Sequence, residues 1–476
     1  MSKIFRKETL TILLTAASLV LVAAAVELML SLAFAGTLFF CFTLLCVAYM
    51  ISTDTSPAYK LGVCVPMLIF PLYSWAYFLL LFPFAKKRKS VFRTAPIPEE
   101  AEPVRRFLCS CGFACFPCEN TRLYPWGSEL FYSLLESIRS SESFVYLEFF
   151  IYSQGRALDM LLRELELCAG RGVEVRVMAD AAGSAFTKPS GFEKRLAAAG
   201  IKLKFFHPLS LSGISRANYR DHRKIAVIDG KYAFFGGINI ADEYFGFIRR
   251  FGVWKDGGAM VSGAAAAAFS DMFLSLWEDS AVPQSIQSSV SPTEAPLAQP
   301  FSDSPLDSVN VGLQVFLSLL SCARHSICIS TPYLACDDEI IGALCCAAGR
   351  GVDVRLYLPH IPDKKYVNII TKSFYEKLLS FGIRIFEFEK GFIHSKNMLC
   401  DDKYAVISTV NLDYRSLSQH YECGCVFYGG DICKELRADL DGLERDCISI
   451  PLADARKTGI FVKIARVFLK LLMPLM

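Results

Sequence analysis

The sequence predicts an α/β protein with two similar halves, preceded by a membrane region. Strands alternate with helices along residues 120–450, and the same order of elements occurs twice, which favours two pseudo-symmetric α-β-α halves with central mixed sheets. A histidine and lysine motif at His222 recurs 172 residues later at His394. Two long apolar stretches lie near the N-terminus.

Residues 1–90 are expected to form the membrane region. Of the 476 residues, 53% are hydrophobic, and the mean hydropathy of +0.36 is high for a soluble enzyme. Thr9–Thr53 holds a single charged residue and is about twice the length of one span, so it predicts a helical hairpin. Leu61–Ala85 holds no charge and predicts a third span, unless its prolines make it kinked or re-entrant. We therefore expect two or three transmembrane helices.

The basic residues that flank these stretches predict the orientation. Lys3, Arg6 and Lys7 precede the first stretch, and the stronger cluster, residues 86–89, follows the last. Because such clusters stay on the cytoplasmic side, everything after residue 90 is expected in the cytoplasm.

A connecting segment, residues 91–119, carries four of the 18 cysteines. These are Cys109, Cys111, Cys115 and Cys118. Their spacing lacks the two well-separated pairs of a structural zinc site, so reduced thiols are expected and a metal role is the alternative. The net charge of +3 is too small for binding to nucleic acid through overall charge.

The first half is expected at 120–278 and the second at 306–450. In the first, 143–152 is a strand with two buried faces, 158–172 an amphipathic helix that ends at glycine, and 173–180 the next strand. The second half repeats this order over 326–388.

Two further segments complete the chain. Residues 279–305, rich in Ser, Pro, Gln and Ala, predict a surface linker. Residues 451–476 form a basic amphipathic segment that suits either a membrane interface or packing against the domain.

The repeated motif predicts a paired phosphodiester site. Its members are His222, Lys224, Asp229 and Asn239 in the first copy and His394, Lys396, Asp401 and Asn411 in the second. On a strand, residues two apart face the same side, so each histidine lies beside its lysine. One imidazole can attack phosphorus, the other can protonate the leaving oxygen, and two lysines can hold the anionic oxygens.

These residues resemble the phospholipase D superfamily, whose signature is a duplicated HxKx4D motif. The segments YRDHRKIAVIDGKYAFFGGINIADEY, TPYLACDDE and STVNLDYRS resemble the bacterial cardiolipin synthase family more closely. The resemblance runs from about residue 55 to the C-terminus, except in the linker and the cysteine cluster. It implies two phospholipase D-type halves.

The resemblance implies a reaction that joins two phosphatidylglycerol molecules into cardiolipin and glycerol, with no metal, cofactor or nucleotide. It assigns His222 as the nucleophile that becomes phosphatidyl-histidine and His394 as general acid and then base, although the symmetry of the sequence permits the reverse. Asn239 and Asn411 would donate N–H groups to the phosphoryl oxygens. Asp229 and Asp401 would brace turns or orient the histidines.

The resemblance also implies that Glu148 and Glu422 fix imidazole tautomers. The partners implied are phosphatidylglycerol and other membrane lipids, without nucleic acid, and the location implied is the bacterial inner membrane with the catalytic part facing the cytoplasm. Phosphatidylserine synthase and a hydrolase remain alternatives within the superfamily, and a lipid-binding scaffold is the non-enzyme alternative. The oligomeric state, acyl preference and second lipid donor stay open.

Overall fold

The computed structural model describes residues 18–19, 22, 33–53, 56–77, 102–118, 120–208, 218–278 and 296–475. The chain divides into two compact units, residues 1–84 together with Leu475 and residues 85–474 together with Met476.

The N-terminal unit contains three described helices around a small apolar core. They are α2 (Ala33–Ser52), α3 (Pro57–Ile69) and α4 (Pro71–Ala76). The third expected span, Leu61–Ala85, is not a single helix in its described part, because α3 ends at Ile69 and α4 begins at Pro71. Pro71 disfavours helical backbone at Phe70, which has φ −125° and ψ 88°. The kinked alternative fits this segment.

Among the described residues, no helix combines the length and the apolar character needed to cross a membrane. Apart from residues 18–19 and 22, the first arm of the expected hairpin lies outside the described residues, as does the end of the third expected span.

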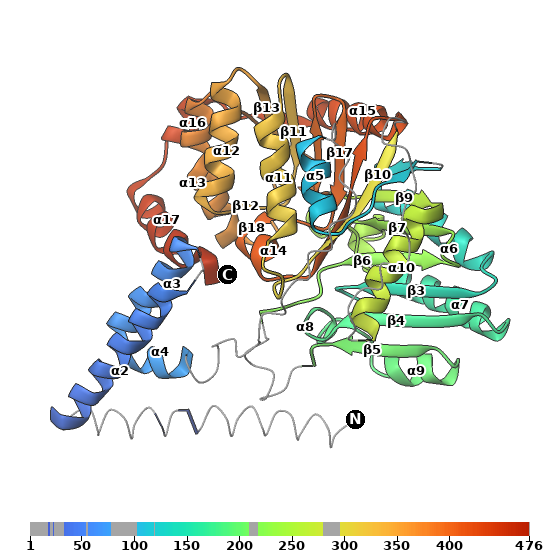
Figure 1. The fold of residues 1–476 in the computed structure, drawn as a ribbon, viewed down its shortest axis with the longest axis horizontal. Helices are drawn as coiled ribbons and strands as arrows, with labels where there is room; N and C mark the ends of the chain where they lie inside the picture. Colours follow the sequence, from blue (N-terminus) through green and yellow to red (C-terminus); the bar gives the residue numbers. More distant parts are fainter. Residues whose placement is uncertain are drawn as a thin grey trace. The chain divides into compact units, whose positions relative to one another are not determined.

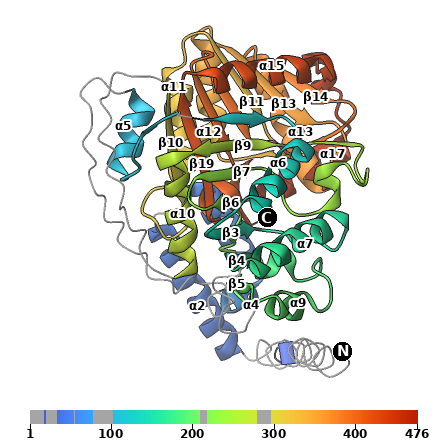
Figure 2. The same cartoon turned by 90° about the vertical axis from the view of Figure 1, so that its right-hand side faces the viewer.

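A seven-stranded mixed sheet forms the centre of the first half. Its order is β2 (Arg122–Tyr124), β9 (Gly258–Ser262), β7 (Tyr232–Gly236), β6 (Lys224–Ile228), β3 (Phe144–Phe149), β4 (Glu174–Asp180) and β5 (Lys202–Phe206). Strands β3, β4 and β5 run parallel and the other pairs are antiparallel. Figure 2 shows β9, β7, β6, β3, β4 and β5 one below another.

A nine-stranded mixed sheet forms the centre of the second half. Its order is β1 (Phe116–Pro117), β10 (Leu297–Asp303), β19 (Glu422–Tyr428), β17 (Tyr404–Ser408), β16 (Asn397–Cys400), β11 (Ser326–Ser330), β13 (Asp353–Pro359), β14 (Arg384–Phe388) and β20 (Cys447–Ser449). Strands β11, β13 and β14 are parallel, as β3, β4 and β5 are. The predicted α/β class with mixed sheets is therefore confirmed.

Helices cover the outer faces of both sheets. Helices α6 (Gly127–Arg139), α7 (Arg156–Gly170) and α9 (Phe192–Ala198) pack on the seven-stranded sheet. Helices α5 (Pro103–Ser110), α11 (Val311–Cys322), α12 (Asp338–Gly349) and α13 (Lys365–Ser380) pack on the nine-stranded sheet (Figure 1). The inner faces share one apolar core with α10 (Gly263–Trp277) and α15 (Asp431–Arg445). This shared core holds the halves together.

Short elements connect the halves and shape their edges. Strand β8 (Val253–Lys255) of the first half pairs in parallel with β15 (Gly391–Ile393) of the second. The remaining short elements are α8 (Ala181–Ser184), η3 (Asp242–Phe245), β12 (Leu334–Ala335), β18 (Leu412–Asp413), α14 (Tyr414–Ser418), α16 (Leu452–Arg456), α17 (Ile460–Leu472) and η4 (Met473–Leu475).

The expected linker at 279–305 extends too far, because β10 occupies Leu297–Asp303 inside the nine-stranded sheet. The composition of the segment suggested a loop, but Gln299 in β10 is fully buried and hydrogen-bonded. Gln299 Nε2 donates to the Phe113 carbonyl at 2.8 Å, and Gln299 Oε1 accepts from the Tyr428 hydroxyl. A hydrogen-bonded polar group is tolerated in a core, and composition does not reveal such partners.

The motif aspartates brace equivalent turns in the two halves. Asp229, after β6, accepts hydrogen bonds from the backbone N–H groups of residues 142–144 at 2.7–3.0 Å. Asp401, after β16, accepts from those of residues 324–326 at 2.7–2.9 Å. Burial alone would raise the pKa of both carboxyls, but these donors outweigh burial and lower it. Both residues adopt positive φ, near 50°.

Replacing either aspartate should weaken the fold rather than the chemistry, since each lies at the far end of its strand from the lysine. We expect Asp229→Ala and Asp401→Ala each to lower the free energy of unfolding by about 1–3 kcal/mol, because three N–H groups lose their acceptor. Denaturant unfolding measures this, with exposed Asp431→Ala as the control. Abolished activity in a fully folded variant would contradict the bracing role.

Candidate functional site

Each motif histidine is anchored by the opposite half of the protein. The backbone N–H of His222 donates to the Tyr421 carbonyl at 2.9 Å, and that of His394 donates to the Lys255 carbonyl at 2.8 Å. The Tyr421 and Lys255 carbonyls therefore hold equivalent positions in the two halves. Pairing of β8 with β15 places Lys255 opposite Ile393, next to His394. The two copies of the motif meet at the interface between the sheets.

A carboxylate from the opposite half holds each imidazole. His222 Nδ1 lies 2.9 Å from Glu422 Oε1, and His394 Nδ1 lies 2.6 Å from Asp256 Oδ2. Because an ionised carboxylate only accepts, Nδ1 carries the proton and Nε2 keeps its lone pair in the neutral ring. Both histidines are thereby held in the tautomer needed for attack or for proton transfer through Nε2.

The two carboxylates are themselves held differently. Glu422 accepts hydrogen bonds from the hydroxyls of Thr409 and Ser416. Asp256 accepts the backbone N–H of Gly257 at 2.8 Å. Gly237 occupies the position equivalent to Thr409, and a Cβ there would lie 2.1 Å from Asp256 Oδ1. Glycine is required because Asp256 approaches the backbone too closely for any side chain.

Both motif lysines are buried beside their histidines. Lys224 Nζ donates to the His222 carbonyl at 2.6 Å, and Lys396 Nζ donates to the His394 carbonyl in the same way. Burial lowers the pKa of Lys224 to about 8 and, with the charge of Lys224 adding to the effect, that of Lys396 to about 7. The charges of the two carboxylates oppose this change.

Burial also lowers the pKa of both histidines, and the lysine charges add to the effect. The pKa of His222 falls well below 6.5, and that of His394 falls to about 4. Both rings are consequently neutral at pH 7, so either Nε2 can act as a nucleophile. The same low pKa disfavours a proton donor until an anion enters the site.

The motif asparagines differ in their contacts. Asn239 Oδ1 accepts the N–H of Ile151 at 3.1 Å, and Asn239 Nδ2 donates to the Tyr244 hydroxyl at 2.8 Å. Asn411 Oδ1 is buried without a hydrogen-bond partner among the described residues. Donation from both amides to phosphoryl oxygens stays a prediction.

Glu148 requires a correction, since it pairs with Arg223 rather than with an imidazole. Glu148 Oε1 lies 3.0 Å from Arg223 Nε, and both side chains are buried. Burial raises the pKa of Glu148, although Arg223 opposes this. The apolar run around Glu148 predicted a buried carboxylate correctly but could not show which cation it meets.

Asp256 is the functional residue that the sequence reasoning missed. The sequence signal is a shared order of residues: Asp256 lies two residues before Gly258, which begins β9, and Glu422, which begins β19, lies two residues before Gly424. The spacing from the motif differs between the halves, so a fixed offset of 172 residues does not align Asp256 with Glu422.

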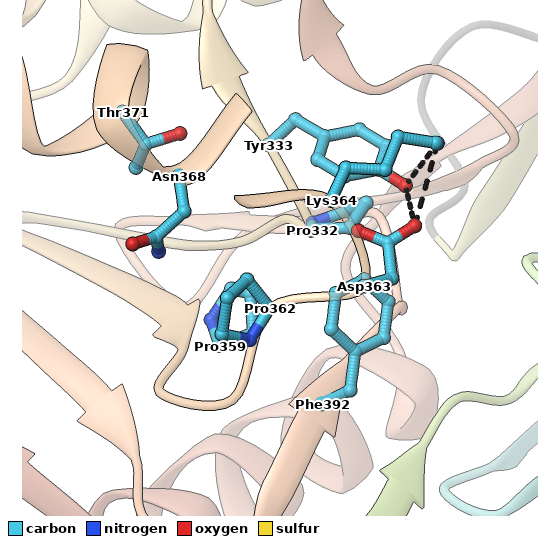
Figure 3. A pocket seen from close by; sticks show the side chains of 9 residues that line it. All are labelled: Pro332, Tyr333, Pro359, Pro362, Asp363, Lys364, Asn368, Thr371 and Phe392. Atoms are coloured by element: carbon cyan, nitrogen blue, oxygen red, sulfur yellow. Dashed lines mark hydrogen bonds and ion pairs between the residues drawn. The ribbon is translucent and has the colours of Figure 1, made fainter. Parts of the chain in front are cut away.

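A third lysine also lies near the site. Lys364 Nζ donates to the Tyr333 hydroxyl at 2.9 Å, and that hydroxyl donates to Asp363 Oδ2 at 2.6 Å. Figure 3 shows these three side chains at a small cavity that Phe392 also lines. The Phe392 ring centroid lies 5.9 Å from that of His394. The charge of Lys364 contributes to the low pKa of His222.

The four clustered cysteines are free thiols in the structure. Burial raises the pKa of Cys109, and it raises that of Cys111 to about 11 and those of Cys115 and Cys118 to about 12. Among the described residues, no group of three cysteines is arranged to share a metal ion.

Comparison with known proteins identifies a family that matches both halves of the chain. Residues 134–277 and 316–443 match the family model described as "Cardiolipin synthase, PLD-like domain". An uncharacterized protein of Streptococcus mutans is 39% identical over 77% of this chain and 81% of its own length. A cardiolipin synthase of Geobacillus kaustophilus is 34% identical over 74% of this chain and 71% of its own, and one of Clostridium perfringens is 32% identical over 74% and 76%.

A solved structure shares the fold at low identity. The phosphatidylserine synthase of Haemophilus influenzae aligns with a TM-score of 0.62 and 14% identity, covering 75% of this chain and 94% of that one. At this identity the likeness concerns the fold alone.

Variants of Asp256 and Glu422 should differ from variants of Glu148 in the property that they impair. We expect Asp256→Asn and Glu422→Gln to lower kcat by about 10²–10⁴-fold, because each removes the group that fixes an imidazole tautomer. Glu148→Gln should instead lower the stability by about 1–3 kcal/mol, since Arg223 then keeps only the more distant Asp221 carboxylate, 3.8 Å from its Nε. Turnover per folded molecule and denaturant unfolding measure the two effects. Equal kcat losses in all three variants would contradict the assignment.

Proposed function

Because the chain belongs to the cardiolipin synthase family of phospholipase D-type phosphatidyltransferases, we propose that it converts two phosphatidylglycerol molecules into cardiolipin and glycerol. The observation that carries this proposal is the pair of neutral histidines, each fixed through Nδ1 by a carboxylate of the opposite half. Two such groups suit a reaction in which one attacks phosphorus and the other moves a proton.

In the first step, His222 Nε2 attacks the lipid phosphorus and the bond from phosphorus to the glycerol oxygen breaks. With the lipid anion bound, His394 carries a proton on Nε2 as well as on Nδ1. It gives the Nε2 proton to that oxygen, so glycerol leaves as a neutral alcohol. A phosphatidyl-histidine remains, with Glu422 stabilising the positive imidazole of His222. The symmetry of the contacts leaves the reverse assignment as the alternative.

The second step reverses the first with a new alcohol. The glycerol hydroxyl of another phosphatidylglycerol gives its proton to His394 Nε2 while its oxygen attacks phosphorus. The bond from phosphorus to nitrogen breaks, which yields cardiolipin, leaves His222 neutral and returns His394 to the protonated form from which it started. Proton and phosphatidyl group are therefore balanced over the cycle.

Lys224 and Lys396 supply the positive charge that phosphoryl transfer requires. Fixed cations in a buried site stabilise the negative charge that spreads over the phosphoryl oxygens in the transition state. The lipid anion in turn favours the protonated forms of the lysines and of His394. Substrate binding thus raises the low pKa of His394 and prepares it as an acid. Asn239 and Asn411 complete the proposed oxygen-binding set.

The lipid substrate supports a membrane location, which we propose to be the bacterial inner membrane with the catalytic unit in the cytoplasm. Helix α17 exposes Phe461, Val467 and Phe468, each more than 60% accessible, beside basic residues. On its other side Lys470 Nζ lies 4.3 Å above the Phe374 ring, so the helix also packs on α13. Such a helix can rest at a lipid interface.

Two fractionation results should follow from this location. Because the expected spans bury apolar side chains in lipid, alkaline extraction should leave the full chain in the membrane pellet. Protease added outside should spare the catalytic unit in spheroplasts and digest it in inverted vesicles. Release by alkali would contradict membrane embedding, and digestion in spheroplasts would contradict the orientation.

Product analysis tests the reaction itself. Full-length protein with phosphatidylglycerol vesicles should form cardiolipin and glycerol in equal amounts. His222→Ala and His394→Ala should each lower the rate by at least about 10³-fold, since neither remaining imidazole can both attack and transfer the proton. Phosphatidic acid as the sole lipid product would indicate a hydrolase. Product formed only from serine and a nucleotide-activated lipid would indicate a phosphatidylserine synthase.

Trapping distinguishes the two histidines. A phosphatidyl donor with a good leaving group needs no acid, so His394→Ala should accumulate the phosphatidyl group on His222. Mass spectrometry of the peptide locates it. Accumulation on His394 in His222→Ala, and none on His222, would reverse the roles.

A further inference from the structure

One polar side chain at the site has no part in the proposed reaction. His420 follows α14, and its ring centroid lies 5.3 Å from that of His222. Both of its ring nitrogens are buried without a hydrogen-bond partner among the described residues. Its Nδ1 lies 3.6 Å from Glu422 Oε1, beyond hydrogen-bond distance. An imidazole buried in this way lacks the partner that its polarity requires.

We propose that His222, His420 and Glu422 form an inhibitory site for a transition-metal ion such as Zn²⁺. Each of the three offers a ligand atom, and these atoms lie within 4.8 Å of one another. Two histidines and a glutamate are a ligand set of known zinc sites, with a water or substrate oxygen in the fourth position. The metal would be an inhibitor and not a participant in turnover.

The geometry requires only a small movement. Tetrahedral zinc with bonds of about 2.0–2.2 Å places its ligand atoms about 3.4 Å apart. The ligand atoms must therefore approach one another from separations of up to 4.8 Å. The His420 ring can rotate to bring them together, because it has no hydrogen bond to break among the described residues. Glu422 is already held by the hydroxyls of Thr409 and Ser416, which provides a fixed anionic ligand.

Ligation would inhibit through either nitrogen of His222. A metal on Nε2 occupies the lone pair that attacks phosphorus. A metal on Nδ1 displaces the proton that Glu422 accepts, so the neutral ring carries its proton on Nε2 and loses its nucleophilic lone pair. The positive charges of Lys224 and Lys396 oppose the ion, and the carboxylates of Glu422 and Asp256 offset them.

Among the described residues of the opposite half, no equivalent group of ligands is found. Trp254 takes the place of His420 there, because each precedes the residue whose carbonyl anchors a motif histidine. The Trp254 ring lies 5.4 Å from that of His394, almost the separation of His420 from His222. An indole offers no lone pair to a metal. The proposed site therefore exists in one half only, which provides matched variants.

The test compares the full chain with His420→Gln and His420→Trp, the second of which copies the other half. Zinc binding is measured by competition with a chromophoric chelator, and Co²⁺ absorption reports the ligand set without any assay of activity. We expect both variants to bind one equivalent of Zn²⁺ fewer than the parent chain. They should also lack the Co²⁺ absorption band expected of a His/His/Glu ligand set. These binding results do not depend on the proposed function, so the two can fail separately.

Inhibition supplies the second readout. Zn²⁺ should inhibit the parent chain reversibly with EDTA, whereas Mg²⁺, which prefers oxygen ligands, should not. Without Zn²⁺ the variants should keep the parent activity, and half-inhibition should need at least about tenfold more Zn²⁺, since even loss of an outer-shell contact costs 10–100-fold in affinity. Trp254→His should add a second equivalent.

Three results would overturn the proposal. Equal binding and inhibition in the parent and the variants would place the ion on the cysteine thiols instead. The absence of a bound equivalent in the parent chain would exclude the site. Loss of activity in His420→Gln without metal, with unchanged folding, would make His420 a part of the lipid site.

Discussion

The exchange of carboxylates between the halves is the constraint on which the site depends. Glu422 of the second half holds His222 of the first, and Asp256 of the first half holds His394 of the second. Each contact requires the two sheets to approach closely, which the shared apolar core and the β8–β15 pairing provide. Folding and the assembly of the site are thus the same event, because the inner core cannot form without bringing both pairs together.

The sequence predicted the parts of this arrangement that repeat. The alternating strands and helices gave the class of fold, and the residues shared by the two motif copies identified the histidines, lysines and aspartates. The resemblance to cardiolipin synthases is confirmed by the family match and by the relatives. Glu422 was found by resemblance to the family, and the structure places it on His222.

The sequence could not predict the contacts that depend on long-range packing. Glu148 was paired with an imidazole because nothing local showed Arg223 beside it, and Asp256 was missed because the two halves differ in loop length. Strand β10 was predicted as part of a linker because its composition is polar. Its buried glutamine, Gln299, forms hydrogen bonds with residues 129 and 186 positions away, which local sequence does not reveal. In the N-terminal unit, the prolines marked a break, but periodicity alone did not decide between a span and a kink.

The asymmetry within the site has a consequence for how such a chain arises. With identical halves, the two-fold relation between the anchors would let two separate copies build the same site as a homodimer, but every substitution would then appear twice. Gly237 is equivalent to Thr409, and Trp254 is equivalent to His420, yet the residues differ. Only a single fused chain can confine such a difference to one half of the site. Covalent linkage thus frees the two half-sites to diverge, so that one histidine can specialise in attack and the other in moving protons.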